Sequence, residues 1–501
     1  MSKLNLFKKQ PKVSSVFDDD YEFQDDDEPI GKKPRKGSHQ KETAPAATVN
    51  KATLTPEDLL KQSEALVKHE SERLLSEADL AFIRNDISNR QGLLMMEAMT
   101  DDTAKAKLRD VILSTHRSKF NKNYSAEDNA DYITDELVGT GLIERLIETD
   151  DTITDIEWDG HHLTVISNDS IVLAEGSSLY ITEDYVNRLI QKFVVINESD
   201  FTPNQALFNG MYGNMRMSAT HKSTSPYGTT FSLRVSKSRL ALNESNWTGF
   251  APAFVLEWFR VLIMSRVNVV IAGETGAGKT ELQKFLLGLA EPLEKFYVIE
   301  DVLESHLKEL YPDRRIFSTL TNAKYTIGDH VKHALRNNPE WIVVAETRSS
   351  EAYEMLQAVL SGHNIITTVH AIDARAIPHR FINMCLSGYS VSEKMLHEDI
   401  YRYFDLGIHI KRARYKNKIY RYLSELVEYN PDGTATTLFK QMFRDGEFHI
   451  KKIGSFSDEI HDKIYEKGLS IIDGDDMVAM VRDGIMSGLP EDFAKMKRKV
   501  G

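Results

Sequence analysis

The chain has 501 residues, and its 62 Lys and Arg are outnumbered by 75 Asp and Glu, for a formal net charge of -13. This length exceeds the roughly 100–200 residues of a typical domain, so we expect more than one domain. Hydrophobic residues make up 41% and charged residues 27% of the chain, which is typical of a soluble globular protein. Because the acidic excess repels a phosphate backbone, stable direct binding to duplex DNA is not expected.

The only cysteine, Cys385, can form neither an intramolecular disulfide nor a multi-cysteine metal site, which fits a reducing cytoplasm. The N-terminal sequence MSKLNLFKKQ has no apolar core of signal-peptide length. No uncharged apolar run approaches the ~20 residues of a membrane-spanning helix. We therefore expect a cytoplasmic protein, whose association with a membrane would be peripheral or through partners.

Residues 1–52 are predicted to form a disordered tail. An acidic run from Asp18 to Glu28 is followed by a basic run from Lys32 to Lys36, and such a segment buries too little apolar surface to offset its ordering entropy. A docking peptide is the alternative interpretation. Residues 53–125 have helical spacing of Leu and Ile, which begins at Thr55-Pro56, where a hydroxyl residue precedes proline at the first helical position.

Residues 126–245 are predicted to form a small α/β domain. A first amphipathic helical pattern breaks near Gly139-Thr140-Gly141. Apolar and polar residues then alternate on both sides of Asp159-Gly160, which predicts a β-hairpin. Thr182 is expected to cap the helix that follows it. Further strands are expected around 211–219 and 229–235.

Strand and helix patterns alternate over residues 246–440, which predicts a parallel sheet with crossover helices. Four short apolar runs are expected to be central strands of one sheet: 268–272, 296–300, 341–345 and 365–369. The remainder, 441–501, is treated as a C-terminal extension with glycine-rich breaks and charged helical pieces, and it has no recognisable site.

Residues 273–280 match the phosphate-loop pattern G-x-x-x-x-G-K-[ST] between a predicted strand and a predicted helix, as the pattern requires. The eight residues are Gly273, Glu274, Thr275, Gly276, Ala277, Gly278, Lys279 and Thr280. The glycines let backbone N–H groups point toward phosphate oxygens. Lys279 would reach the β- and γ-phosphates, and the Thr280 hydroxyl would ligate Mg²⁺. The pattern therefore predicts a site for ATP and Mg²⁺.

Acidic residues and a histidine follow three of the predicted strands. Glu346 closes 341–345, Glu300 and Asp301 close 296–300, and His370 follows 365–369. The carboxyl ends of parallel strands share one edge of a sheet, where the phosphate loop also lies. Taken singly, such acids are more often solvated loop residues and such a histidine is structural. Beside a phosphate loop, carboxylates can organise the metal and the attacking water, and His370 could sense the γ-phosphate.

Four segments, IAGETGAGKT, VIEDVLE, ALRNNPEWIVVAETR and SGHNIITTVHA, resemble in order and spacing the Walker A, Asp-box, Walker B and His-box motifs of the type II/type IV secretion ATPase superfamily. Upstream, LVGTGLIERLIETDDTITDIEWDG looks like the start of the family's N-terminal domain, and NESDFTPNQALFNGMYGNMRMSA and TTFSLRVSK look like its later strands. The resemblance covers roughly residues 130–440. Because one cysteine cannot build the tetracysteine zinc insert of many pilus-assembly members, the branch of conjugation-type and tight-adherence-pilus ATPases fits best.

The resemblance implies a RecA-like motor domain behind a smaller N-terminal α/β domain, and a homohexamer that serves an inner-membrane secretion, conjugation or pilus machine from its cytoplasmic face. It gives Walker B duty, and a share in holding Mg²⁺ directly or through water, to Glu346. It makes Glu300 and Asp301 the Asp-box acids and His370 the His-box residue, and it leaves open how Glu300 and Glu346 divide their roles. Two arginines of the N-terminal domain would neutralise phosphate charge on closure, Arg216 and Arg234.

Ala345 and Val302 depart from the residues usual in the Walker B and Asp boxes, which are glycine and proline. The substitution at Ala345 keeps open a second function, an ATP-binding switch or scaffold with negligible turnover. A third, a helicase-type motor, shares the phosphate loop, but the acidic charge and the absence of an Arg/Lys stripe with interleaved aromatics count against it.

Overall fold

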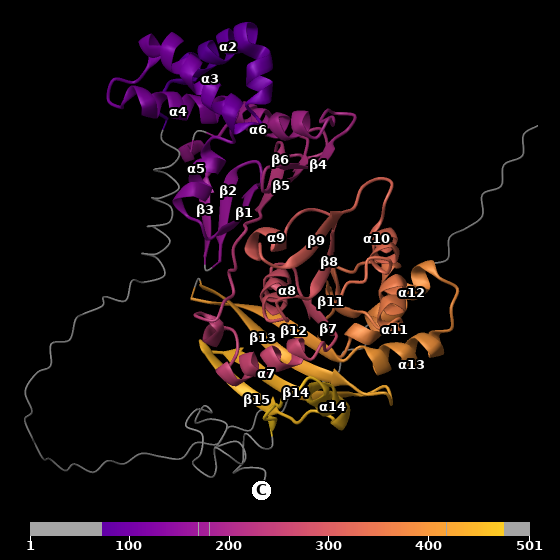
Figure 1. Ribbon diagram of the computed structural model, residues 1–501. Helices are drawn as coiled ribbons and strands as arrows, with labels where there is room; N and C mark the ends of the chain where they lie inside the picture. The colour runs from indigo at the N-terminus through magenta and orange to yellow at the C-terminus, as the bar shows by residue number, and fades with distance from the viewer. Residues whose placement is uncertain (1–72, 169, 180, 417, 475–501) are drawn as a thin grey trace, which may run out of the picture. The chain divides into compact units, whose positions relative to one another are not determined.

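A computed structural model describes residues 73–168, 170–179, 181–416 and 418–474, so the tail predicted at 1–52 and the helix start predicted at Thr55 lie outside the described residues. Its first part is a helical layer with a core of its own, built from residues such as Ile83, Leu108 and Ile133 (Figure 1). The helices of this layer are α2 (Glu77–Glu97), α3 (Asp102–Thr115), η1 (Arg117–Lys119) and α4 (Ala126–Leu137), whereas the next helix, α5 (Leu142–Thr149), packs into the core of the sheet domain that follows. The predicted break falls between α4 and α5, where Gly141 has φ +60°.

The N-terminal α/β domain is a six-stranded antiparallel sheet with strand order β3-β2-β1-β6-β5-β4 and helix α6. Its elements are β1 (Ile153–Trp158), β2 (His162–Ser167), β3 (Ile171–Glu175), η2 (Gly176–Leu179), α6 (Glu183–Ile196), β4 (Leu207–Tyr212), β5 (Met215–Thr220) and β6 (Thr230–Val235). The hairpin predicted at Asp159-Gly160 is confirmed, because Trp158 pairs with Leu163. The Thr182 side chain caps α6 by accepting a hydrogen bond from the Tyr185 backbone N–H, as predicted.

The expectation of a strand over 211–219 was wrong in one respect, because the segment contains a tight turn. Gly213, with φ +56°, separates β4 from β5, and the two strands pair with Tyr212 opposite Met215. Residues 215–219 alternate between apolar and polar, which favours a strand, but the Gly213-Asn214 dipeptide before them is a two-residue hairpin signal that marks where the chain reverses.

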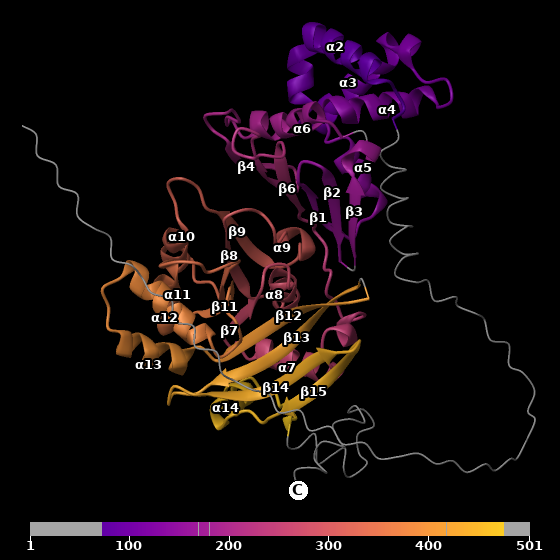
Figure 2. The ribbon, with the colours of Figure 1, turned by 180° about the vertical axis from the view of Figure 1, so that it is seen from behind.

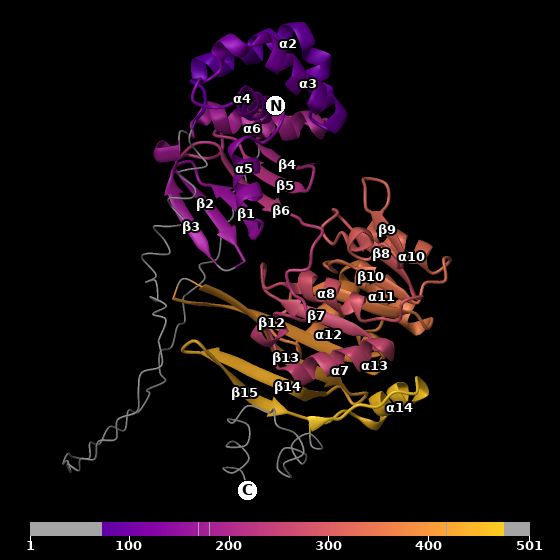
Figure 3. The same ribbon diagram turned by 60° about the vertical axis from the view of Figure 1, so that its left-hand side comes forward.

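The motor domain is built on a nine-stranded sheet with strand order β15-β14-β13-β12-β7-β11-β10-β8-β9 (Figure 3). Neighbours from β12 through β9 are parallel, and β12 to β15 pair antiparallel. The strands are β7 (Val269–Gly273), β8 (Lys295–Glu300), β9 (Arg315–Leu320), β10 (Trp341–Val344), β11 (Asn364–Val369), β12 (Leu406–Tyr415), β13 (Lys418–Tyr429), β14 (Ala435–Arg444) and β15 (Glu447–Ile453). The four strands predicted from apolar runs are confirmed as β7, β8, β10 and β11 of one sheet.

Alternate residues of the central strands point to opposite faces of the sheet, and each face has its own core. Val269 and Ile271 of β7 pack with α7 and α8, whereas Val270 and Ala272 pack with α10 to α13 (Figure 2). The helices and turns are η3 (Trp247–Gly249), α7 (Ala253–Met264), α8 (Lys279–Gly288), α9 (Leu307–Leu310), α10 (Ile327–Ala334), α11 (Glu351–Leu360), α12 (Ile377–Gly388), α13 (Glu393–Tyr403) and α14 (Asp458–Glu466). The core between the sheet and helices α10 to α13 encloses Cys385 completely, and this burial raises the pKa of its thiol to about 12.

Residues beyond 440 continue this sheet. The boundary expected near 440 falls inside β14, and residues 447–453 form β15 rather than the helical pieces expected there. Between 441 and 474, the described part of this extension, α14 is the one helix that matches the expectation. Lys463 of α14 donates a hydrogen bond to the Asp405 carboxylate at 2.6 Å, and the backbone N–H of Asn268 donates to the same carboxylate at 2.7 Å. These contacts join α14 to the starts of β7 and β12.

None of the helices in the described part of the chain combines the length and apolar character that crossing a bilayer requires.

Candidate functional site

The phosphate-loop residues connect β7 to α8 in a conformation that depends on glycine. Gly276 has φ +73° and Gly278 has φ +98°, in the left-handed region that favours glycine. The Lys279 ammonium group is turned back onto the loop, where it donates to the carbonyl oxygens of Gly273 at 3.0 Å and Glu274 at 3.2 Å. Burial, with only 8% of Lys279 exposed, lowers the pKa of this lysine. A phosphate would replace neutral carbonyl partners by charged ones, so the loop fits a nucleotide.

One cavity of about 710 Å³ collects most of the predicted site. Its lining includes residues 275–280 of the phosphate loop, together with Glu346, His370 and, from β6 of the N-terminal domain, Arg234. Residues 418–421 of β13 and the Glu304 side chain line it as well. The sequence motifs therefore meet at one hollow, although Glu300, Asp301 and Arg216 are not among its lining residues.

Glu346 follows β10 and is held by two side chains. Arg348 Nη2 lies 2.8 Å from Glu346 Oε2, and His370 Nε2 lies 3.2 Å from Oε1. Burial alone would raise the pKa of Glu346, but the hydrogen bond and charge of Arg348, together with His370 and Lys279, bring this pKa below its ordinary value. Burial also lowers the pKa of His370, as do the charges of Lys279 and Arg348. Glu346 is therefore ionised and His370 neutral at pH 7.

Arg348 is a residue that the sequence motifs did not single out. Its guanidinium pairs with Glu346 and, through Nη1, with the Asp301 carboxylate at 3.4 Å, so it connects the Walker B and Asp-box segments. The signal available in the sequence was a cation two residues after a strand-ending acid.

Glu300 and Asp301 have separate surroundings. Glu300 is buried, with 1% of its surface exposed, and it accepts hydrogen bonds from the Ser305 backbone N–H at 2.9 Å and from Ser305 Oγ at 2.7 Å. Burial raises the pKa of Glu300. Asp301 is exposed and accepts from Thr321 Oγ1 at 2.9 Å. In this conformation Glu300 organises the turn after β8 rather than facing the cavity.

Arg216 and Arg234 lie opposite each other on β5 and β6. Arg234 Nε pairs with Asp155 Oδ1 at 3.0 Å, and Arg216 Nη1 pairs with Glu304 Oε1 at 3.3 Å. Both guanidiniums thus have carboxylate partners here, and only Arg234 lines the cavity.

Within the described residues, no cluster of three or more His, Cys, Asp and Glu side chains could hold a metal ion. Mg²⁺ at phosphate sites usually takes one or two protein ligands and completes its shell with phosphate oxygens and water. Thr280 and Glu346 both line the cavity, so the residues fit a Mg²⁺ that arrives with a nucleotide.

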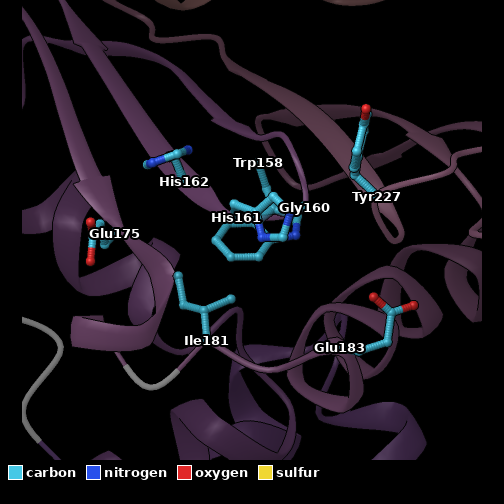
Figure 4. Close-up of a pocket in the computed structure, with 8 residues that line it drawn as sticks. All are labelled: Trp158, Gly160, His161, His162, Glu175, Ile181, Glu183 and Tyr227. Atoms are coloured by element: carbon cyan, nitrogen blue, oxygen red, sulfur yellow. The ribbon is translucent and has the colours of Figure 1, made fainter.

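A second hollow, of about 570 Å³, lies within the N-terminal α/β domain. Figure 4 shows His162 and Glu175 on one side of it and Tyr227 and Glu183 on the other. Two of its lining side chains have protein partners: Thr229 donates to Glu183 Oε1 at 2.6 Å, and His162 Nδ1 lies 3.3 Å from Asp159 Oδ2. The cavity at the phosphate loop remains the candidate site.

Residues 184–468, more than half of the chain, match the family described as type II/IV secretion system protein. The chain belongs to this family. An uncharacterized protein of Bacillus anthracis is 42% identical over 403 residues, which cover 78% of this chain and 91% of that protein. A Mycobacterium tuberculosis protein, provisionally named a conjugal transfer protein, is 27% identical over 302 residues, 56% of this chain and 82% of that protein.

The crystal structure of the VirB11 ATPase from the Brucella suis type IV secretion system is similar at 18% identity and a TM-score of 0.33, and the match covers 58% of this chain and 93% of that one. Membership of the type II/IV secretion ATPase family, inferred above from four motifs, is confirmed. The expected α/β class, with an N-terminal α/β domain ahead of the phosphate-loop domain, is confirmed as well.

Proposed function

We propose that this chain is a cytoplasmic ATPase that hydrolyses ATP to power a bacterial type IV secretion, conjugation or pilus-assembly machine. The observation that carries the proposal is the single cavity lined by the phosphate loop, Glu346, His370 and Arg234. Family membership supports it. We place the chain in the conjugation-type and tight-adherence branch, as a homohexamer on the inner face of the cell membrane, with inner-membrane machine components as its partners. Direct nucleic-acid contact has no part in the proposal.

In this proposal the phosphate loop binds ATP through its backbone N–H groups and the N-terminus of α8. Lys279 exchanges the carbonyl oxygens of Gly273 and Glu274 for the β- and γ-phosphates. Bound Mg²⁺ would neutralise charge on the transferred phosphoryl group, and Thr280 and Glu346 would hold it directly or through water.

Glu346 has the charge state that this role needs, because its lowered pKa keeps it ionised and able to orient the attacking water. His370, neutral at pH 7, fixes the Glu346 carboxylate through Oε1. Glu300 is a positioning residue that holds the turn at 304–305, and Asp301 acts through Arg348. The base role therefore goes to Glu346.

Closure of the N-terminal domain completes the mechanism. Arg234 and Arg216 are adjacent on β5 and β6, and each has a carboxylate partner in the described conformation. We infer that ATP draws them away from Asp155 and Glu304 toward its phosphates, so that hydrolysis reopens the domains. The cycle then has a nucleotide-bound and a nucleotide-free state that differ in interdomain contacts.

A second candidate function, an ATP-binding switch or scaffold with negligible turnover, is favoured by one observation. Both oxygens of Glu346 are engaged, by Arg348 and by His370, and Ala345 stands where the family usually has glycine. With this carboxylate fixed in place, the site would bind ATP through the phosphate loop, but Glu346 would not activate water.

Mg²⁺-dependent ATP hydrolysis by the purified chain separates the two functions. Lys279→Ala should abolish nucleotide binding. Glu346→Gln should still bind ATP but turn over at least ~10²-fold more slowly, about 2.7 kcal/mol of barrier. Glu257→Gln, which changes an exposed glutamate of α7, is the matched control. Light scattering with and without ATP tests the hexamer. If the wild type turns over no faster than Glu346→Gln, the switch proposal replaces the motor proposal.

A further inference from the structure

The β12–β13 hairpin contains a pair of arginines that no sequence motif singled out. Arg412 of β12 and Arg421 of β13 are direct cross-strand partners. Like charges in directly opposite positions of an antiparallel pair destabilise the sheet. An anion beside the guanidiniums offsets this cost. The Glu274 carboxylate lies 3.8 Å from Arg412 Nε, and a negatively charged ligand beside Arg421 would offset it further.

Both arginines contact the phosphate loop at the same glycine. Arg421 Nε donates to the Gly276 carbonyl oxygen at 2.9 Å. Arg412 Nη1 lies 3.1 Å from the position that a Cβ on Gly276 would take, and Arg412 Nε lies 3.8 Å from Glu274 Oε1. The two side chains therefore enclose Gly276, and a side chain at this position would push Arg412 away.

Arg421 also lines the candidate nucleotide cavity, as do Lys418 and Tyr420 of the same strand. Its Nη1 donates to the Asn168 carbonyl oxygen of the N-terminal domain at 2.6 Å. A guanidinium has five N–H donors in a rigid fork that suits phosphate oxygens. A ligand that fills the cavity therefore meets a positive charge from β13 in addition to those of Lys279 and Arg234.

We propose that Arg412 and Arg421 form an arginine clamp that binds the polyphosphate of the nucleotide, with Arg421 contacting phosphate directly and Arg412 acting as a positioning residue through Gly276 and Glu274. This inference rests on the proposed nucleotide site. It adds to the Walker A, Walker B, Asp and His boxes a phosphate-binding element on β12 and β13.

Isothermal titration with Mg·ATP, in a Glu346→Gln background that prevents turnover, tests the clamp without relying on activity. Arg421→Ala should raise the Kd about 10- to 100-fold, since a charge-assisted hydrogen bond to phosphate is lost. Arg412→Ala should raise it less, about 3- to 10-fold, because this residue acts indirectly. Arg414→Ala removes the same charge from β12, two residues away on an exposed position, and should leave the Kd within about twofold.

Inorganic tripolyphosphate is the second probe, and Arg421→Ala should weaken its binding by the same factor. A variant that loses ATP but retains tripolyphosphate would place Arg421 on the nucleoside and overturn the assignment. Thermal melting without ligand checks the fold. Should Arg421→Ala not fold, Arg421→Lys takes its place, because it keeps the charge and loses the fork; it should bind at least about fivefold more weakly, and binding equal to the parent would overturn the clamp.

Lys279→Ala in the same background keeps the two proposals apart. Unchanged ATP binding by Lys279→Ala would refute the nucleotide site itself. Binding lost in Lys279→Ala but retained within twofold in Arg421→Ala would refute only the clamp.

Discussion

Replacement of Lys463 by methionine tests whether the residues after 440 are part of the motor core. The Asp405 carboxylate at the start of β12 is buried, with 8% of the residue exposed, and its two hydrogen-bond donors are Lys463 Nζ and the Asn268 backbone N–H. Burial raises the pKa of Asp405, and both partners oppose that rise. Methionine keeps an unbranched apolar stem and removes the ammonium group.

The expected loss follows from the contacts. Removing one partner of a buried ion pair leaves the other charge uncompensated, at a cost of about 3–5 kcal/mol. The Lys463 side chain is 40% exposed, so water screens part of the interaction, and we expect about 2–3 kcal/mol. For a domain of this size, this corresponds to a fall in melting temperature of about 4–12 °C.

The loss should depend on pH in one direction. Without Lys463 the pKa of Asp405 rises further above its unfolded value. A carboxyl group with a raised folded pKa contributes stability that is fully present below the unfolded pKa and is lost as pH rises through the folded pKa. The deficit of Lys463→Met should therefore be largest near pH 8 and shrink toward pH 5.

Calorimetric or circular-dichroism melting across this pH range is the assay. Asp405→Asn retains an acceptor for the Asn268 N–H and removes the buried charge, so the Asp405→Asn/Lys463→Met double variant should recover most of the lost stability. Lys467→Met, at an exposed position after α14, should melt like the parent. An equal deficit at pH 5 and pH 8, or no recovery in the double variant, would refute the reasoning.

Three further outcomes are expected. Lys284→Met should lower the free energy of unfolding by about 2–3 kcal/mol, because the buried ammonium donates to Glu281 Oε1 at 2.8 Å and to the Arg239 carbonyl oxygen at 2.9 Å. An unchanged melting temperature would contradict this. Gly276→Ala should weaken Mg·ATP binding at least about tenfold while the fold melts normally, because alanine disfavours φ +73°, and titration decides. Hydrolysis should be flat between pH 7 and 8 and fall below about pH 6.5, where His370 with its lowered pKa gains a proton; His370→Gln should remove this limb, and a limb centred above pH 7 would contradict it.

Local patterns predicted the elements that depend on local interactions. The alternation around Asp159-Gly160 became the β1–β2 hairpin, and the hydroxyl of Thr182 caps α6. The apolar runs that became β7, β8, β10 and β11 are buried on both faces, so their composition alone marked them. The phosphate loop was predictable in place and shape, because its glycines meet the backbone requirement directly.

Long-range pairing and side-chain partners were not predictable in this way. β12 pairs in parallel with β7, although more than 100 residues separate the two strands in the sequence, and β13 to β15 extend the sheet beyond β12. No periodicity shows that Ser305 engages the Glu300 carboxylate, or that Arg421 reaches Gly276. These contacts arise only when distant segments fold together, which is why the motifs named Glu300, Asp301 and Glu346 alike and did not distinguish their surroundings.

The enclosure of Cys385 also determines how motion in this protein can be followed. Thiolates rather than thiols react with maleimides and disulfides, and a buried thiol with a pKa of about 12 supplies almost none at neutral pH. Because Cys385 is the only cysteine in the chain, pairs of cysteines placed at exposed sites such as Leu173 and Leu293 would be the reactive ones. Spin labels or dyes on them can report distances between β3 and the motor domain, with and without ATP, in a chain whose native thiol is left in place.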